Sequence, residues 1–222
     1  MQVRGDYSSN ELNSLLMSKK IIFWDFDGVI KETIDIKAEA FSSLFSDCSP
    51  KVQARIRKYQ LAYPGVSRYE KIPIYLQWAN RASNQENVAK YCLLFSKLVY
   101  ENVLTAPWVP GVREYLQNNY RDQKYILVSA TPDEEIQRIV AELSIDKYFI
   151  DIYGSPAKKS QVIQEKLFEE NIASSDGIFI GDAETDYLAS QEAGIPFLLR
   201  RTKYNKELQD IFYGPQFESL VL

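Results

Sequence analysis

The chain of 222 residues contains no histidine. Catalytic pairs in which a histidine activates a serine or a cysteine are therefore excluded, and so is any zinc site with histidine ligands. The chemistry of this protein has to rest on carboxylates, lysines and hydroxyl groups, together with a hard metal ion where a metal takes part.

Cysteine is scarce, and long apolar runs are missing. Cys48 and Cys92 lie far apart without a CxxC pattern, so we expect free thiols in a reducing cytoplasm. No run approaches the roughly 20 apolar residues that cross a bilayer. The segment Leu15-Leu16-Met17 is too short, and its surroundings too polar, for the core of a signal peptide. We therefore expect a cytoplasmic protein without a membrane segment.

The charge balance also argues against some partners. A net charge of −4 disfavours nucleic acid or an anionic membrane surface as the main partner. The contents of 45% hydrophobic and 25% charged residues are those of an ordinary globular protein, long enough for one large domain or a core with a smaller insert. We expect a monomer or a weak dimer that acts on a small molecule.

An apolar run that ends in two acids is the most informative stretch. Residues 21–24 read as a buried strand, and Asp25, Asp27 and Gly28 follow it. Residues two apart in a strand point to the same side, so both carboxylates would converge at the carboxyl end of the strand. Two like charges held so close need a cation or a shared proton, and Gly28 lets the backbone turn away.

Residues 34–105 carry helical periodicity and no strand pattern. Apolar residues recur three and four positions apart in the groups that begin at Ile34, Ile72 and Val88, which predicts helices packed on one another. Tyrosines are frequent within residues 59–100, either as contacts for a sugar or as part of this helical core. We expect a small all-α cap domain over residues 34–105.

Beyond residue 106 the pattern alternates between helix and strand. Expected helices cover residues 112–119, 132–143, 160–169 and 185–192, and expected strands cover residues 125–128, 148–152, 177–180 and 196–199. Residues 203–222 read as an irregular tail with a helical turn. Short apolar strands separated by helices predict an α/β fold, a Rossmann-like three-layer sandwich with a parallel sheet. Residues 1–33 and 106–222 would form this core.

Polar residues follow each expected strand. Ser129, Ala130 and Thr131 end the second, with Thr131 as the expected N-cap of the next helix. Lys158 and Lys159 follow the third strand. Each of these groups has a structural alternative: a cap, or a solvated loop.

Asp182 and Asp186 follow the fourth strand, where they could also serve as acids in the first turn of a helix. Ligands bind at the carboxyl ends of strands in open α/β sheets, so the polar groups jointly indicate a phosphate site with a hard cation. Asp25 and Asp182 offer the oxygen ligands that Mg²⁺ prefers. Ser129, N–H groups near Ala130 and one lysine would hold the phosphate.

The four motifs together resemble the haloacid dehalogenase-like superfamily of hydrolases. They are Asp25-x-Asp27-Gly28-Val29, Ser129, Lys159 ahead of a helix, and Gly181-Asp182-x-x-x-Asp186. The resemblance covers nearly all of residues 20–200, and the helical insert after the first motif matches the helical-cap subclass.

The resemblance implies roles for single residues. Asp25 would be the nucleophile, and Asp27 the general acid and then the general base. Asp182 would bind Mg²⁺ together with Asp25 and the backbone carbonyl of Asp27, and Asp186 would lie close to the metal or steer the lysine. Lys159 is preferred over Lys158, because it sits where the family's lysine opens a helix. An acid at Asp27 favours phosphatases and phosphomutases over dehalogenases.

The expected cap adds one candidate for the substrate. Gly65-Val66-Ser67-Arg68 resembles a segment of β-phosphoglucomutase that places an arginine over the substrate, where Arg68 could hold a second phosphate or a carboxylate. The alternative is a glycine turn followed by a helix cap at Ser67. Where that mutase has a histidine, this chain has Lys37, and a cap lysine also resembles the Schiff-base lysine of phosphonate-cleaving relatives.

The sequence therefore predicts a Mg²⁺-dependent phosphatase for a small phosphorylated metabolite such as a sugar phosphate, acting through an aspartyl-phosphate. The alternatives are an intramolecular sugar phosphomutase and a non-catalytic phosphate sensor. A sensor of the receiver type would carry its acid after a later strand and would lack an inserted cap.

Overall fold

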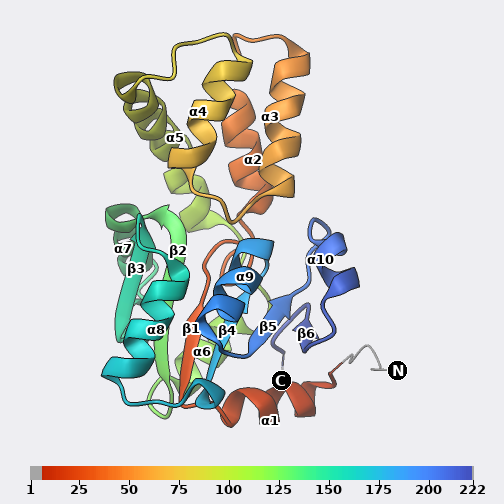
Figure 1. Ribbon diagram of the computed structural model, residues 1–222, viewed down its shortest axis with the longest axis vertical. Helices are drawn as coiled ribbons and strands as arrows, with labels where there is room; N and C mark the ends of the chain where they lie inside the picture. The colour runs from red at the N-terminus through yellow and green to blue at the C-terminus, as the bar shows by residue number, and fades with distance from the viewer. Residues whose placement is uncertain (1–6, 222) are drawn as a thin grey trace.

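The apolar segments of the core form one parallel sheet. The computed structural model describes residues 7–221, and within them six strands lie in the order β3-β2-β1-β4-β5-β6, all parallel (Figure 1). The strands are β1 Ile21–Trp24, β2 Lys124–Pro132, β3 Asp151–Ser155, β4 Gly177–Gly181, β5 Phe197–Arg200 and β6 Gln216–Phe217. The predicted α/β fold with a parallel sheet is confirmed, and β1 lies at its centre, between β2 and β4.

Helices cover both faces of this sheet. Along β1, Ile22 and Trp24 join one apolar cluster, and Ile21 and Phe23 join another on the opposite face. Both clusters are fully buried at this strand, which explains its uninterrupted apolar run. The flanking helices are α1 Ser9–Met17, α6 Val112–Asn119, α7 Asp133–Glu142, α8 Lys159–Glu169, α9 Glu184–Ala193 and α10 Lys206–Ile211. The result is the expected three-layer sandwich.

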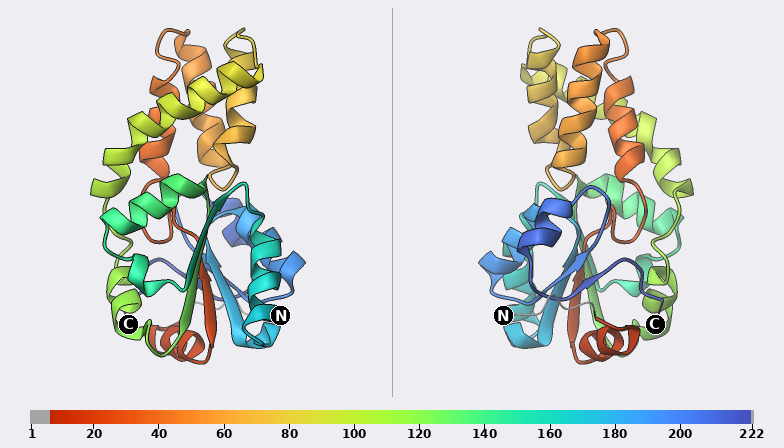
Figure 2. Two further views of the ribbon diagram at one scale, coloured as in Figure 1. Left: turned by 90° about the vertical axis from the view of Figure 1, so that its left-hand side faces the viewer. Right: turned by 90° about the vertical axis from the view of Figure 1, so that its right-hand side faces the viewer.

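Four helices form a separate layer beyond one end of the sheet. They are α2 Ile34–Ser43, α3 Pro50–Ala62, α4 Arg68–Trp78 and α5 Gln85–Thr105. Both views of Figure 2 show them gathered at the end where the strands deliver their carboxyl termini. Their contacts are aromatic: Phe41 stacks on Phe95, and Tyr75 is fully buried between Phe41 and Phe45. The structure thus places Tyr75 in the apolar interior.

Two adjacent linkers connect this layer, which we call the cap (residues 34–105), to the sheet. The amide of Glu32 donates to the carbonyl of Pro107 at 2.9 Å, and the amide of Val109 donates to the carbonyl of Ile30 at 3.0 Å. Lys31 adds a bond from its ammonium to the carbonyl of Leu104. The two linkers are therefore hydrogen-bonded to each other through their backbones, at the boundary between the sheet and the cap.

Several predicted elements differ from the observed ones. The helix over residues 112–119 has the predicted bounds, but β3 begins three residues later than expected, and β2 continues to Pro132. The tail contains β6 as well as the predicted helical turn. The helix α3 had no predicted counterpart. The core expected over residues 1–33 and 106–222 also includes residues 1–6 and 222, which lie outside the described residues.

The cysteines and the lengths of the helices were also considered in the sequence. Both cysteines are free thiols, Cys92 buried and Cys48 partly exposed, as expected. Among the helices of residues 7–221, including the 21-residue α5, none has the length and apolar character that a membrane crossing requires.

Candidate active site

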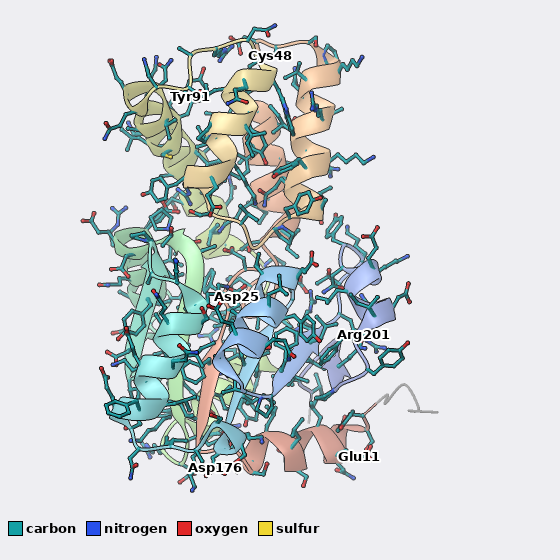
Figure 3. All side chains as sticks on the ribbon, in the orientation of Figure 1. Glu11, Asp25, Cys48, Tyr91, Asp176 and Arg201 are labelled. Carbon is teal, nitrogen blue, oxygen red and sulfur yellow. The ribbon has the colours of Figure 1, made fainter. Side chains whose placement is uncertain are left out.

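Three carboxylates converge at the end of the sheet that faces the cap. Asp25 follows β1 and Asp182 follows β4, the neighbouring strand, while Asp186 lies in the first turn of α9. One oxygen from each of these three carboxylates lies within 4.8 Å of the others, and all three residues are buried. Figure 3 shows Asp25 at this edge of the sheet, opposite the end that carries Asp176. The structure thus brings together the acids that the sequence placed at successive strand ends.

A single lysine joins this acidic cluster. The ammonium of Lys159, in the first turn of α8, donates to Oδ1 of Asp25 at 2.7 Å and to Oδ1 of Asp186 at 2.6 Å. Lys158 is exposed at the start of the same helix. Asp25 and Asp186 raise the pKa of Lys159 strongly, although burial opposes them. Lys159, rather than Lys158, is therefore the cation that binds Asp25 and Asp186.

Asp186 organises the loop that carries Asp182. Its Oδ2 accepts the backbone N–H groups of Asp182 at 3.2 Å and of Ala183 at 3.1 Å. Gly28 lies against the same loop with a φ of +76°, and a Cβ there would stand 2.6 Å from Oδ2 of Asp182. Only glycine fits this turn without displacing the carboxylate.

The environment of the carboxylates decides whether a cation would fit this cluster. Oδ2 of Asp182 is buried and has no hydrogen-bond partner among the described residues. Burial, with Asp186 and Asp25 adding to it, raises the pKa of Asp182 well above its ordinary value. Burial likewise raises the pKa of Asp25 to about 7, with Asp186 and Asp27 adding to the rise and Lys159 opposing it. Buried carboxylates with such pKa values and a free oxygen fit a hard divalent cation.

Asp27 lies in a contrasting environment. Its carboxylate accepts hydrogen bonds from the hydroxyls of Thr33 at 2.5 Å and Thr131 at 3.2 Å, and from the ammonium of Lys37. Burial alone would raise the pKa of Asp27, but the Lys37 charge and these bonds outweigh it and lower the pKa. The surroundings of Asp27 therefore favour its ionised form, whereas those of Asp25, two residues earlier, favour the protonated form.

The contacts of Asp27 correct one expectation and add two residues. Thr131 is not the cap of the next helix, because α7 begins at Asp133 and the hydroxyl of Thr131 donates to Asp27 instead. Thr33 was missed; it is the N-cap residue that precedes α2, and its hydroxyl donates to Asp27. Lys37 entered the sequence argument only through the resemblance to the mutase, and the structure shows it bound to Asp27 and to Thr131.

The expected phosphate-binding residues border an open cleft. Ser129, Ala130 and Lys159 line a cleft of about 680 Å³ whose other wall carries Gly65 and Ser67 of the cap. Ser129 is buried, and its Oγ accepts the backbone N–H of Thr131 at 3.1 Å. The cleft thus leads from solvent to the acidic cluster.

Arg68 is bound within the protein, whereas one of the two expectations had it available to a substrate. Its guanidinium forms two bonds to the carboxylate of Glu135 in α7, of 2.8 and 2.6 Å, and donates to Ser96 at 2.6 Å. Arg68 is only 4% exposed. Its planar guanidinium can be buried there because both of its terminal nitrogens bond to the carboxylate of Glu135. Ser67 caps α4, as the alternative had it, accepting the amide of Tyr69. Arg68 therefore joins the cap to the core.

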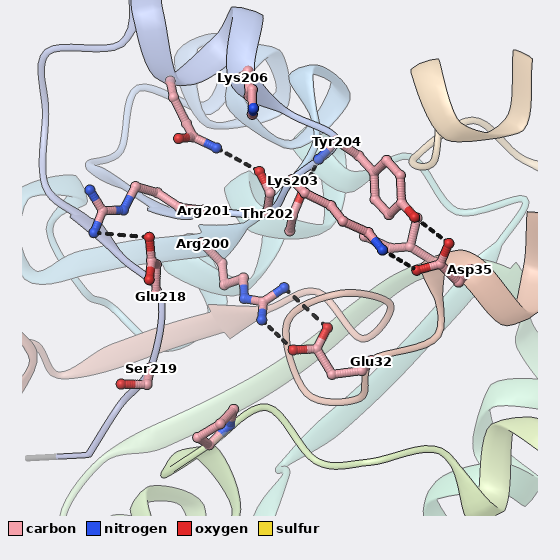
Figure 4. A pocket seen from close by; sticks show the side chains of 13 residues that line it. Glu32, Asp35, Arg200, Arg201, Thr202, Lys203, Tyr204, Lys206, Glu218 and Ser219 are labelled. Carbon is pink, nitrogen blue, oxygen red and sulfur yellow. Dashed lines mark hydrogen bonds and ion pairs between the residues drawn. The ribbon is translucent and has the colours of Figure 1, made fainter. Parts of the chain in front are cut away.

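A second large pocket carries no predicted site residue. It has a volume of about 770 Å³ and lies between the linker after β1 and the segment around α10 (Figure 4). Its ion pairs are Arg200 with Glu32, Lys203 with Asp35 and Arg201 with Glu218. Three cations of this pocket are thus paired with carboxylates of the protein, and two of these pairs, at Glu32 and Asp35, join the segment after β1 to the C-terminal segment.

The fold and the site define a class of protein: an α/β enzyme that gathers carboxylates and one lysine at the ends of its central strands, beneath a helical cap. The chain belongs to the haloacid dehalogenase-like hydrolase family, which its sequence matches over residues 21–199. The predicted family is confirmed. A comparison with curated protein sequences finds no significant match.

Solved structures share this fold across nearly the whole chain. A proposed β-phosphoglucomutase from Thermotoga maritima is 20% identical, with a TM-score of 0.67, covering 90% of this chain and 94% of that one. CbbY from Rhodobacter sphaeroides, in complex with xylulose 1,5-bisphosphate, is 13% identical, with a TM-score of 0.74 and coverages of 91% and 95%. A predicted phosphoglycolate phosphatase from Haemophilus somnus is 18% identical, with a TM-score of 0.72 and the same coverages. At these identities the likeness establishes the fold.

Proposed function

We propose that this protein is a Mg²⁺-dependent phosphatase that hydrolyses a small phosphorylated metabolite in the cytoplasm. The observation that carries the proposal is the cluster of Asp25, Asp182, Asp186 and Lys159 beside Ser129, in which one carboxylate oxygen of Asp182 has no partner among the described residues. Such a cluster suits a phosphate group held between a cation, a lysine and hydroxyl or N–H donors.

The residues that would hold Mg²⁺ are Asp25, Asp182 and the backbone carbonyl of Asp27, with Asp186 close by. Asp186 already orients the loop of Asp182 and the ammonium of Lys159. When bound, Mg²⁺ would neutralise charge on the phosphate oxygens and hold them for in-line attack. Its charge would also favour the ionised form of Asp25, whose pKa burial raises to about 7.

The first step uses both acids of the opening motif. An ionised oxygen of Asp25 attacks phosphorus, and the bond from phosphorus to the leaving oxygen breaks while Asp27, which has to take up a proton from solvent beforehand, gives that oxygen the proton. Ser129 and Lys159 line the cleft where the phosphate oxygens would lie. Lys159 donates to Asp25, so its ammonium lies close enough to bind the phosphate oxygens as the new bond forms. The product is an aspartyl-phosphate on Asp25.

The second step regenerates the enzyme. Asp27, now ionised, takes a proton from a water molecule, and the resulting hydroxide attacks phosphorus and releases inorganic phosphate from Asp25. The bonds from Thr33, Thr131 and Lys37 favour the ionised form of Asp27 that this step needs. A phosphate sensor would have no use for an acid held in this position.

The phosphomutase alternative loses its main support. It rests on the segment that ends in Arg68 and on an arginine that grips a second phosphate. In this structure Glu135 occupies that guanidinium on both of its terminal nitrogens. The neighbours named as a mutase or bound to a bisphosphate share only the fold at 13–20% identity.

The test is hydrolysis of 4-nitrophenyl phosphate by the purified protein. We expect turnover that requires Mg²⁺ and disappears in Asp25→Asn. Asp176→Asn is the matched control, because Asp176 lies at the opposite end of the sheet and pairs with Lys20 on the surface. Activity that survives in Asp25→Asn would rule out the aspartyl-phosphate route.

A further inference from the structure

Lys71 is a buried ammonium group of the cap. Lys71 in α4 is 1% exposed, and its Nζ donates to Oε1 of Gln60 at 2.6 Å and to the carbonyl of Pro64 at 3.3 Å. Both acceptors are neutral. Within residues 7–221, no carboxylate forms an ion pair with this ammonium. The ammonium also lies over the ring of Phe41, 5.9 Å from its centroid. A buried charge whose hydrogen bonds go only to neutral groups is costly, and burial lowers the pKa of Lys71 to about 7, although Asp27 and Glu70 oppose this effect.

The position of this ammonium relates it to the proposed chemistry. Lys71 lines a small cavity of about 20 Å³ between the cap and the sheet, together with Asp27, Ala130 and Thr131. A general acid must lie within hydrogen-bond reach of the oxygen that it protonates. If Asp27 is that acid, the leaving group of the substrate has to occupy this side of the site, in the cavity that Lys71 also lines.

The cavity has more cationic than anionic side chains in its lining. Its charged lining residues are Asp27, Lys37, Arg68 and Lys71. Lys37 is paired with Asp27, and Arg68 is paired with Glu135. Lys71 is the remaining cation, and Glu70, its neighbour in the chain, has an exposed side chain and lines the outer cleft rather than this cavity. A ligand anion would complete the set.

The size of the cavity limits what that anion can be. A volume of about 20 Å³ holds roughly one water molecule, so the cap has to move slightly to admit a leaving group. A compact leaving group needs the least movement. The arginine suited to grip a phosphate with two bonds is already used by Glu135, and one ammonium matches the charge of one carboxylate.

We propose that Lys71 binds a carboxylate on the leaving group, so that the preferred substrates are phosphate esters of short hydroxy acids. The inference rests on the proposed function, because it uses Asp27 as the acid that marks the leaving-group side. It adds to that function a residue that selects the substrate and an anionic class of substrate.

The test compares two esters that differ in charge but little in size. Phosphoglycolate carries a carboxylate, and 2-hydroxyethyl phosphate carries a neutral hydroxyl at the same position. We expect wild type to prefer phosphoglycolate in kcat/KM, and Lys71→Met to reduce that preference about 10- to 100-fold, as for the loss of a hydrogen bond to a charged group. Lys90→Met, at an exposed lysine of the same cap, should keep the wild-type preference.

The ester 4-nitrophenyl phosphate, whose leaving group carries no carboxylate, separates the two ideas. If its hydrolysis does not depend on Asp25, the proposed function fails. If it does depend on Asp25, but the preference for phosphoglycolate is the same in wild type and Lys71→Met, the role of Lys71 fails alone. A wild-type preference for ethylene glycol bisphosphate over phosphoglycolate would overturn the assignment to a carboxylate.

The stability of the variant distinguishes recognition from support of the fold. An ammonium kept for its bonds to Gln60 and Pro64 would make Lys71→Met less stable, whereas an ammonium kept for a ligand leaves the free protein as stable or more stable when it is removed. If Lys71→Met does not fold, Lys71→Gln retains a donor toward Gln60 and carries the same comparison of esters. Its preference for phosphoglycolate should fall as well.

Discussion

Metal-free protein should lose stability as the pH rises through the range just below neutral. The pKa of Asp25 is raised from 3.8 to about 7, mainly by burial, and that of Asp182 is raised well above 3.8 by burial and its neighbouring acids. A carboxyl group with a raised pKa binds its proton more tightly in the folded protein than in the unfolded chain. Its contribution to stability is therefore complete below the ordinary pKa and is lost as the pH rises toward the folded value.

The magnitude follows from the size of the shift. Between the two pKa values of Asp25, unfolding becomes easier by about 1.4 kcal/mol for each pH unit. From pH 5.5 to 7.0 this amounts to about 2 kcal/mol for Asp25, and Asp182 adds to it. For a chain of this length, about 2 kcal/mol lowers Tm by about 4–8 °C.

The pH window avoids other titrating groups. Asp27 and Glu135 have lowered pKa values, so their stabilising contributions are complete above their ordinary pKa values and stay constant across the window. The pKa of Lys71 is lowered to about 7, so its contribution changes mainly above pH 7. The slope between pH 5.5 and 7.0 therefore reports the acidic cluster.

The assay is a thermal unfolding series in EDTA and in Mg²⁺. We expect Tm to fall with pH in EDTA, and Mg²⁺ to raise Tm more at pH 7.0 than at pH 5.5, because ionised carboxylates bind the cation. In Asp182→Asn the slope in EDTA should be shallower and the response to Mg²⁺ should be lost. A Tm in EDTA that is flat or rising across this window, with the same profile in Asp182→Asn, would refute the raised pKa values of Asp25 and Asp182.

Two further predictions concern single contacts. Asp27→Asn should lower kcat for 4-nitrophenyl phosphate by about 10²–10⁴-fold. Mg²⁺ should still raise Tm at pH 7.0 in this variant, since the backbone carbonyl of residue 27 is unchanged. Loss of that rise would show that the variant disturbs the metal site. Arg68→Ala should lower the free energy of unfolding by about 3–5 kcal/mol, because it leaves Glu135 buried and unpaired. Arg57→Ala, which breaks a solvent-exposed pair with Glu39, should cost at most about 1 kcal/mol in the same denaturant titration, and equal costs would contradict the role of burial.

The fold was predictable where the local pattern and the long-range packing agree. The helix over residues 112–119 has a clear apolar stripe, and β1 and β4 have continuous apolar runs that two covered faces require. The strand β6 has two residues and lies at the edge of the sheet beside β5, so it is too short to show a strand pattern in the sequence. The helix α3 buries Ile56 and Gln60 among many polar residues, which weakens its apolar stripe.

The core of the site was predictable for a geometric reason. Parallel strands end at one edge of the sheet, so acids that follow β1 and β4 and a lysine after β3 have to meet there. The contacts of the cap follow from no such rule. The pairing of Arg68 with Glu135 joins residues 67 positions apart on two packed helices, and nothing local to either residue indicates the other. Lys71 looks like a surface lysine until α3 is seen to cover it.

Asp25 and Asp27 differ in which part of the protein controls them. The cation bound to Asp25 is Lys159, on a helix of the core. Asp27 is bound by Lys37, which belongs to α2 in the cap. Since Lys37 is the strongest influence that lowers the pKa of Asp27, movement of α2 away from the sheet would raise that pKa and favour the protonated acid. The same displacement that would admit a substrate would thus prepare Asp27 to give up a proton, whereas closure restores the base that the second step requires.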